Sequence, residues 1–132
     1  MTPRDLGMTL GRELPRLVPG LAAAYLFGSQ ARGDATPTSD VDVALLYERT
    51  PASTLAARPF LVTSELESIL GRDVDVVVLN DAPPDLVHRV LRDGIIVFEA
   101  DRRARIAFEV KARNEYFDLL PTLERYRRAR TA

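Results

Sequence analysis

Four short apolar runs punctuate the chain. Residues 21–27 and 43–47 are unbroken apolar segments, while 74–79 and 95–98 are rich in Val and Ile and are bounded by charged or turn residues. Short apolar runs of this length, flanked by turn formers, are typical of strands buried in a sheet. The pattern therefore predicts a sheet of about four strands.

Apolar residues recur at helical spacing between these runs. A capping Thr followed by Pro at positions 2–3 starts a first helix, and Pro15 is expected to kink or restart it because proline lacks an amide donor. A second helix is expected over about 59–70, with Gly71 as its stop. The predicted buried stripes are Leu6, Leu10, Leu14 and Leu17 in the first helix, and Val62, Leu66, Ile69 and Leu70 in the second.

Two further helices complete the pattern. One begins at residues 83–85 and ends at 93–94, with Leu86, Val87, Val90 and Leu91 as its buried side. The chain from Asp101 onward reads as a single long helix whose apolar face is wide. Its main stripe is predicted to be Ile106, Val110, Phe117 and Leu120, broadened by Phe108, Tyr116, Leu119 and Leu123.

Strands and helices in this order indicate the α/β (α+β) class, with a small mixed sheet of about four strands flanked by helices. We expect one compact domain over residues 1–100. Residues 101–132 form a C-terminal helix that packs on this domain, on a partner, or on both. The width of the apolar face leaves those alternatives open.

Composition adds limits on location. The 132 residues include no cysteine, which excludes disulfides and thiolate metal sites and fits a reducing, cytoplasmic setting. The first residues lack the apolar core of a signal peptide, and no run approaches the ~18 apolar residues of a membrane span. We therefore expect a cytoplasmic protein that does not associate with membranes.

Charge is distributed unevenly along the chain. The formal net charge is −1, yet residues 34–100 hold an excess of acids and residues 101–132 an excess of bases. An acidic centre suits a metal-binding site, and a basic tail could contact phosphates or an acidic protein. A solvated helix face accounts for the basic tail equally well.

The segment between the first two predicted strands carries the candidate chemistry. Gly28 and Ser29 follow the first strand directly, where a short helical turn would present backbone amides and a hydroxyl to phosphate oxygens. Arg32 in the same turn is a candidate phosphate contact, with an exposed arginine as the equal alternative. The segment predicts a phosphate-binding turn.

Two carboxylates open the second strand. Asp40 and Asp42 are two residues apart, so a strand places them on one face, about 6–7 Å apart along the backbone. Strands disfavour Asp, and paired carboxylates repel unless a cation relieves them. Mg²⁺ binds through one or two carboxylates plus substrate phosphates, which makes this pair a candidate magnesium site.

Asp75 stands among valines in the third predicted strand. A lone buried carboxylate costs several kcal/mol unless it is paired or liganded. If the third strand lies beside the second, Asp75 can complete a three-carboxylate cluster with Asp40 and Asp42. This argument favours Asp75 over Asp73, which is expected in the loop before the strand.

The Gly-Ser pair, ten intervening residues and Asp40-Val41-Asp42 resemble the signature of the polymerase-beta-like nucleotidyltransferase superfamily. The flanking sequence LFGSQARGDATPTSDVDVALL resembles the minimal nucleotidyltransferases (MNT), and the likeness extends over about residues 10–99. The resemblance implies that fold, with ATP as substrate and two Mg²⁺ ions as cofactors. It implies that Asp40, Asp42 and Asp75 are the catalytic, metal-binding residues and that Gly28 and Ser29 hold the outer phosphates of ATP.

The resemblance also implies a partner. Stand-alone members of the family are antitoxins that add AMP to a tyrosine of a helical HEPN-type ribonuclease toxin, so we expect such a hetero-oligomer and no direct binding of nucleic acid. Two alternatives stay open: a small-molecule nucleotidyltransferase similar to those that inactivate aminoglycosides, and a non-catalytic antitoxin that acts by binding. His88, the one histidine, lies mid-helix without an evident partner and is expected to pack rather than catalyse.

Overall fold

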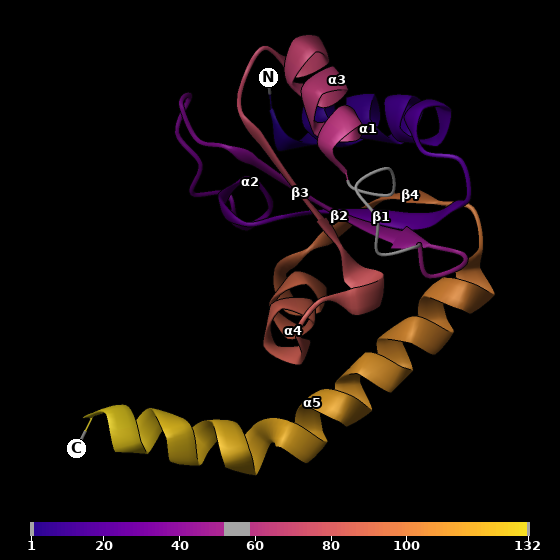
Figure 1. The fold of residues 1–132 in the computed structure, drawn as a ribbon. Helices are drawn as coiled ribbons and strands as arrows, with labels where there is room; N and C mark the ends of the chain where they lie inside the picture. Colours follow the sequence, from indigo (N-terminus) through magenta and orange to yellow (C-terminus); the bar gives the residue numbers. More distant parts are fainter. Residues whose placement is uncertain (1, 52–58, 132) are drawn as a thin grey trace.

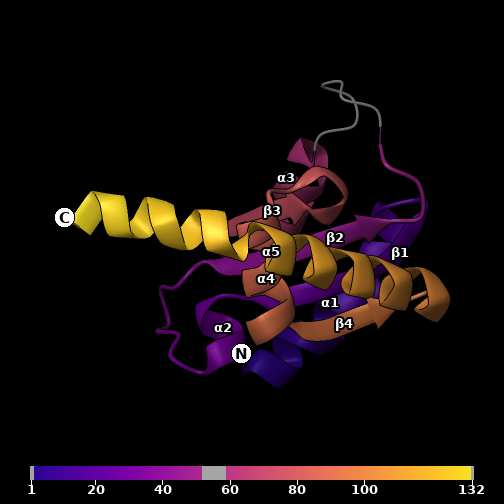
Figure 2. The same ribbon diagram turned by 90° about the horizontal axis from the view of Figure 1, so that it is seen from below.

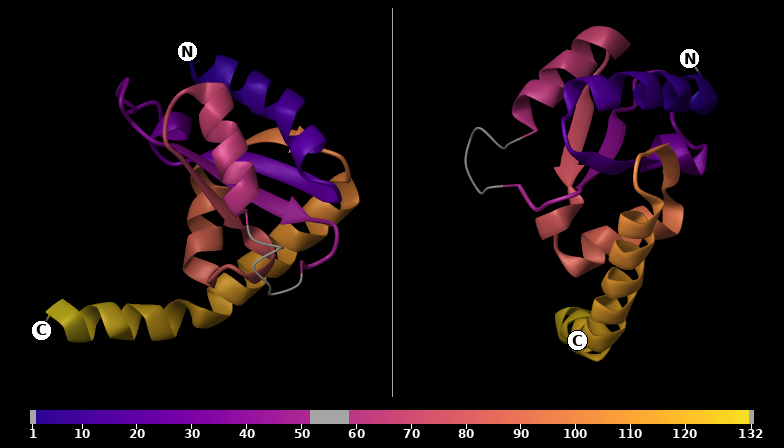
Figure 3. Two further views of the ribbon diagram at one scale, coloured as in Figure 1. Left: turned by 45° about the horizontal axis from the view of Figure 1, so that its top comes forward. Right: turned by 90° about the vertical axis from the view of Figure 1, so that its right-hand side faces the viewer.

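A four-stranded mixed sheet with helices on both faces forms the molecule (Figure 1). The computed structural model describes residues 2–51 and 59–131. Helices α1 and α3 cover one face and α4 and α5 the other, as views from below and from two further sides also show (Figures 2 and 3). The elements in chain order are α1 Pro3–Leu17, β1 Leu21–Phe27, α2 Ser29–Arg32, β2 Val41–Tyr47, α3 Phe60–Leu70, β3 Val74–Val78, the 3-10 turn η2 Leu79–Asp81, α4 Pro84–Asp93, β4 Ile95–Glu99 and α5 Arg102–Thr131.

The strand order is β3-β2-β1-β4. Strand β1 runs antiparallel to both β2 and β4, whereas β2 and β3 are parallel and are joined across the face by α3. The predicted class and number of strands are confirmed. The parallel β2–β3 pair brings the beginnings of these two strands to the same end of the sheet, next to the end of β1.

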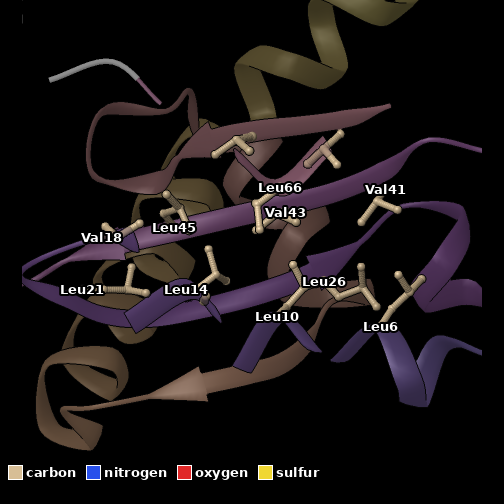
Figure 4. Packing of buried hydrophobic residues seen from close by; sticks show 13 residues of the cluster. Leu6, Leu10, Leu14, Val18, Leu21, Leu26, Val41, Val43, Leu45 and Leu66 are labelled. Carbon is tan, nitrogen blue, oxygen red and sulfur yellow. The ribbon is translucent and has the colours of Figure 1, made fainter. Parts of the chain in front are cut away.

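Helix α1 builds the core on the first face. Thr2 caps it through a reciprocal pair of hydrogen bonds with Asp5, a capping box. Leu6, Leu10 and Leu14 are fully buried against strand residues such as Leu26, Val43 and Leu45 (Figure 4). The helix continues through Pro15 to Leu17, so the predicted restart does not occur. Pro15 is in the last turn, where losing one amide donor leaves the preceding turns intact.

Small residues shape the second face. Ala22, Ala23 and Ala44 are buried beneath α4 and α5, where they pack with Val87, Val90 and Ala112. Alanines on the sheet let helix backbones approach closely. Tyr25 is also buried here, and its hydroxyl donates a 3.0 Å hydrogen bond to Glu109 of α5. Arg105 bridges Glu99 and Glu109 beside it, which fastens the start of α5 to the sheet.

The predicted buried face of α1 is confirmed, and the faces predicted for the other three helices are corrected in part. Helix α3 ends at Gly71 as expected, but Ile69 is exposed while Leu66 is the fully buried residue. In α4, Leu86 and Leu91 are half-buried beside the buried Val87 and Val90. In α5 the predicted main stripe is wrong, because the exposed residues include Ile106, Val110 and Phe117.

The face of α5 that packs on the domain is the narrower one, with Ala104, Phe108 and Ala112. Among the described residues, neither core cluster includes a residue of α5 beyond Ala112. Helix α5 contains Pro121 and changes direction along its length, and its final part projects past α4 (Figures 1 and 3). In the described part of the chain, no helix is both long and apolar enough to cross a membrane.

Candidate active site

A cleft lies where β1 ends and β2 and β3 begin, on the face that α4 covers. Its volume is about 480 Å³, within the usual range for sites that hold small molecules. Three walls meet there: the turn into α2, the strand ends that carry the acids, and one side of α4. The lining residues are Phe27, Gly28, Ser29, Arg32, Asp42, Asp75, Val77, Leu86, Arg89, Arg92 and Asp93.

Gly28 is required by the backbone and by the space around it. Its φ of +72° and ψ of −151° lie in a region that is essentially restricted to glycine. A Cβ at this position would be 2.1 Å from Oδ2 of Asp42. The absence of a side chain therefore lets the turn into α2 and the Asp42 carboxylate lie against each other.

Asp42 and Asp75 are direct neighbours across the parallel pair of strands. The register aligns Asp42 with Asp75, flanked by Val41 with Val74 and Val43 with Val76. Side chains alternate between the two faces along a strand. Because the valines face the core, both carboxylates point to the opposite face, into the cleft. The expectation that Asp75 is buried is wrong: Asp75 is exposed and Asp42 is half-buried. The prediction that the third strand lies beside the second is confirmed.

Asp42 is the electrostatically perturbed acid of the site. Partial burial raises the pKa of the Asp42 carboxyl, and the charges of Asp75 and Asp40 raise it further, while Arg32 lowers it. Two other carboxylates and one guanidinium therefore act on Asp42. A bound cation would relieve this repulsion, which is the behaviour expected of metal-ligand carboxylates.

Asp40 does not join the other two acids in the cleft wall. It is exposed and precedes β2, whose ladder begins at the 3.0 Å hydrogen bond from Val41 N–H to the Asp73 carbonyl. In residues 2–51 and 59–131, no group of three or more Asp, Glu, His or Cys side chains is arranged to hold a metal ion. The predicted three-carboxylate cluster is therefore not assembled, because the backbone at Asp40 is outside the sheet.

The donor set nevertheless fits a hard divalent cation. Mg²⁺ needs only one or two protein carboxylates when substrate phosphates complete its shell. Asp42 and Asp75 supply such a pair, and the pKa of the Asp42 carboxyl is raised by burial first and by the charge of Asp75 second. The site can thus hold a cation between the strand ends and a phosphate chain beside the turn at Gly28.

The other predicted phosphate contacts lie at the mouth of the cleft. Ser29 begins α2 and lines the cleft together with Arg32. Arg32 is exposed and forms an ion pair with Asp34 at 3.3 Å. The charge of Arg32 lowers the pKa of the Asp42 carboxyl, against the larger effects of burial and of Asp75 and Asp40.

Sequence reasoning missed the α4 wall. Leu86, Arg89, Arg92 and Asp93 line the cleft, although only the buried side of α4 was expected to matter. The available signal was the recurrence of Leu86, Arg89 and Asp93 at three- and four-residue spacing, which places them on one face. His88 lies outside this face and stacks on Tyr116 of α5, with ring centroids 3.8 Å apart. It packs, as expected.

Comparison with known proteins bears on this geometry. Residues 16–103 match the family described as Polymerase beta, Nucleotidyltransferase. The protein adenylyltransferase MntA of Aphanizomenon flos-aquae (strain 2012/KM1/D3) is 32% identical over 97 residues, which cover 68% of this chain and 65% of that protein.

Solved structures extend the likeness to the whole chain. A chain from the crystal structure of a toxin-antitoxin with AMP-PNP superposes with a TM-score of 0.80 at 27% identity, with all of both chains covered. A second chain, from a tri-AMPylated Shewanella oneidensis HEPN toxin in complex with MNT antitoxin, gives a TM-score of 0.77 at 27% identity. That comparison covers 98% of this chain and 99% of the other.

Proposed function

Because the chain belongs to the polymerase beta nucleotidyltransferase family, as its motif predicted, we propose that it is an antitoxin that AMPylates a partner toxin. It transfers AMP from ATP to a tyrosine hydroxyl of a HEPN-type ribonuclease. The observation that carries the proposal is the close approach of Gly28 to Asp42, with Asp75 beside it, in a cleft large enough for a nucleotide. The likeness to MntA and to a chain solved with AMP-PNP supports it.

Each residue of the cleft has a proposed role. Gly28 and Ser29 hold the outer phosphates of ATP, with Arg32 as a further contact, and Asp40, Asp42 and Asp75 hold Mg²⁺. Two such ions would neutralise phosphate charge and stabilise the attacking and leaving oxygens of an in-line displacement. Asp40 is assigned to this group because it lies directly before β2 and its charge adds to the rise in the pKa of the Asp42 carboxyl.

The transfer breaks one phosphoanhydride bond of ATP and forms one phosphate ester bond to the acceptor. The acceptor oxygen forms a bond to the α-phosphorus, and the bond from that phosphorus to the bridging oxygen of the β-phosphate breaks. Pyrophosphate leaves with the electron pair. Asp75, on the outer side of the acid pair and exposed to the cleft, accepts the hydroxyl proton.

The acceptor comes from a second protein. The cleft is open at the surface, and the described elements of the proposed catalytic domain (residues 1–100) include none that would enclose a large acceptor. Residues 101–132, the C-terminal helix, are the proposed contact with the toxin. We place the reaction in the cytoplasm, with no direct role for nucleic acid binding by this chain.

Label transfer tests the proposal. The protein is incubated with a HEPN-type toxin, Mg²⁺ and ATP labelled at either the α- or the γ-phosphate. We expect label on the toxin from the α-position alone. Asp42→Asn and Asp75→Asn should lower the rate by on the order of 100-fold, while the matched control Asp73→Asn, an exposed acid outside the cleft, retains it.

Two outcomes would contradict the enzymatic proposal. Label on an aminoglycoside-like small molecule and none on any toxin would identify a small-molecule nucleotidyltransferase. If Asp42→Asn suppressed RNA cleavage by the toxin as well as the unmodified chain does, binding alone would explain neutralisation.

A further inference from the structure

The proposed function leaves the α4 wall of the cleft without a role. Arg89 and Arg92 project from α4 into the same cleft as Gly28, Ser29 and Asp42. Arg89 shares its helix face with Leu86 and Asp93, so this face of α4 is turned to the cleft along two turns. Two guanidinium groups beside a nucleotide-sized space require an explanation.

The charges on this wall are not balanced within it. Arg92 donates two hydrogen bonds to the carboxylate of Asp93, at 3.0 and 2.8 Å, and is thereby held in place. Arg89 forms no ion pair with any residue in the described parts of the chain, and it is exposed to the cleft. An arginine that lines a cleft without a counter-charge is suited to an anionic ligand, and its planar fork matches phosphate oxygens.

The wall and the acids belong to different elements of one cleft. Asp42 and Asp75 come from the beginnings of β2 and β3, whereas Arg89 and Arg92 come from α4. A cation held by the acids would act at the α-phosphate, where the reaction takes place. The guanidinium groups on α4 are then available to the rest of the triphosphate.

We propose that Arg89 and Arg92 bind the β- and γ-phosphates of ATP from the α4 side of the cleft, with Asp93 positioning Arg92. This inference rests on the proposed use of ATP, and it assigns to α4 the selection of a triphosphate over a monophosphate. The cleft then has two chemically distinct parts. Carboxylates on the strand ends hold cations, and arginines on α4 hold the leaving pyrophosphate.

Nucleotide binding by the isolated chain tests this assignment without any acceptor. Affinities for ATP and for AMP are measured by titration calorimetry in Mg²⁺. We expect Arg89→Ala to weaken ATP binding by on the order of 10-fold and to leave AMP binding unchanged. Arg92 is tested with the double variant R92A/D93N, which keeps the net charge of the cleft constant. This variant should also weaken ATP binding and leave AMP binding unchanged. Arg89→Lys should recover part of the loss.

The matched control is Arg49→Ala, an exposed arginine just after the far end of β2, which should bind both nucleotides as the unmodified chain does. Thermal unfolding confirms that each variant is folded. ATP affinity unchanged in Arg89→Ala and in R92A/D93N would overturn the inference, even if transfer to the toxin fell, because the arginines would then contact the acceptor.

The two proposals fail in different ways. A loss of ATP affinity on replacing Arg89, together with no AMP transfer to any toxin, would support the inference and contradict the proposed acceptor. An unmodified chain that binds no ATP in Mg²⁺ would contradict both.

Discussion

Gly28 and Asp42 form the central contact of the site, because the turn that would hold phosphate touches the carboxylate that would hold the cation. Their closeness depends on one missing Cβ, which would be 2.1 Å from Oδ2 of Asp42. The glycine also adopts a backbone conformation that other residues avoid. A side chain at position 28 is therefore expected to affect both the stability of the fold and the geometry of the site.

Gly28→Ala is expected to lower the free energy of unfolding by about 1–3 kcal/mol and to abolish ATP binding, since the carboxylate must move. Gly33→Ala is the matched control. Gly33 also has a positive φ, +82°, but a Cβ there meets nothing within 4 Å. Gly33→Ala should lower the free energy of unfolding by roughly 1–2 kcal/mol and leave ATP binding intact. Denaturant unfolding and calorimetry measure the two effects, and equal losses of ATP binding would contradict the argument.

The partial burial of Asp42, together with the charges of Asp75 and Asp40, predicts a pH dependence. The pKa of the Asp42 carboxyl is raised in the folded protein, so between the unfolded and folded pKa values the folded state binds more protons and stability falls as pH rises. In the metal-free protein, Asp42→Asn should therefore raise the thermal midpoint at pH 7, and this gain should shrink as pH falls toward 4.

At pH 7, Mg²⁺ should raise the thermal midpoint of the unmodified chain more than that of Asp42→Asn. The unmodified chain should then have the higher midpoint of the two. A midpoint of Asp42→Asn that equals or falls below that of the unmodified metal-free chain at pH 7 would contradict the account.

Sequence reasoning succeeded where short-range rules fix the residue. The spacing between two apolar runs singled out Gly28, Ser29 and Asp42, which line one cleft, and the odd Asp75 among valines lines it beside them. Asp40 does not line this cleft, and the roles of these residues stay predictions. The reason given for Asp75 was wrong, because alternation along β3 exposes this side chain while its neighbours are buried. Arg89 and Arg92 escaped notice because their face adjoins the buried stripe of α4, and periodicity does not separate a core face from a cleft face.

At the scale of elements, α5 is fastened to the sheet by a polar cluster as well as by packing. Tyr25, 2% exposed, donates a hydrogen bond to Glu109, which also accepts from Arg105 and Arg113. Burial raises the pKa of Tyr25, and Glu109 adds to this, so the phenol remains a donor at neutral pH. This cluster fixes the direction in which α5 leaves the domain.

Tyr25→Phe should lower the free energy of unfolding by about 1 kcal/mol through loss of this hydrogen bond. Tyr126→Phe, at an exposed site on the same helix, serves as control and should change it by less than about 0.5 kcal/mol. Urea unfolding compares them. Equal effects would show that the hydroxyl of Tyr25 contributes nothing specific.

Strand limits and helix ends were the elements best predicted, because glycine and proline mark them: β1 has the expected bounds and α3 stops at Gly71. The contacts of α5 were not predictable in the same way. Its apolar residues surround much of the helix, so the sequence left open which of them the sheet would cover. The alanines of β1 and β2 selected the face around Ala112, and larger residues such as Val110 and Phe117 remain exposed.

At the scale of the whole molecule, the last part of α5 stands away from the domain. It projects on the same side of the molecule as α2, which borders the cleft (Figures 1 and 2). Exposed apolar residues on it include Phe117, Leu119 and Tyr126, and its last residues are rich in arginine. A toxin held by this helix would lie near the mouth of the cleft.

A chain that ends at Leu120 should therefore stay folded, with a free energy of unfolding within about 0.5 kcal/mol of the full chain, yet bind the toxin more weakly. Phe117→Ser should also weaken the complex. The matched control is Phe60→Ser on α3, because Phe60 is 72% and Phe117 65% exposed but α3 covers the other face. Native mass spectrometry measures the complexes. Unchanged toxin binding by the shortened chain would contradict a role for this segment.

The most direct measurement of the central claim is the intact mass of a HEPN-type toxin after incubation with this protein, ATP and Mg²⁺. The account predicts that the toxin gains one or more AMP units with the unmodified chain and none with Asp42→Asn. An unchanged toxin mass, with a stable complex formed by both versions, would contradict it and leave neutralisation by binding alone.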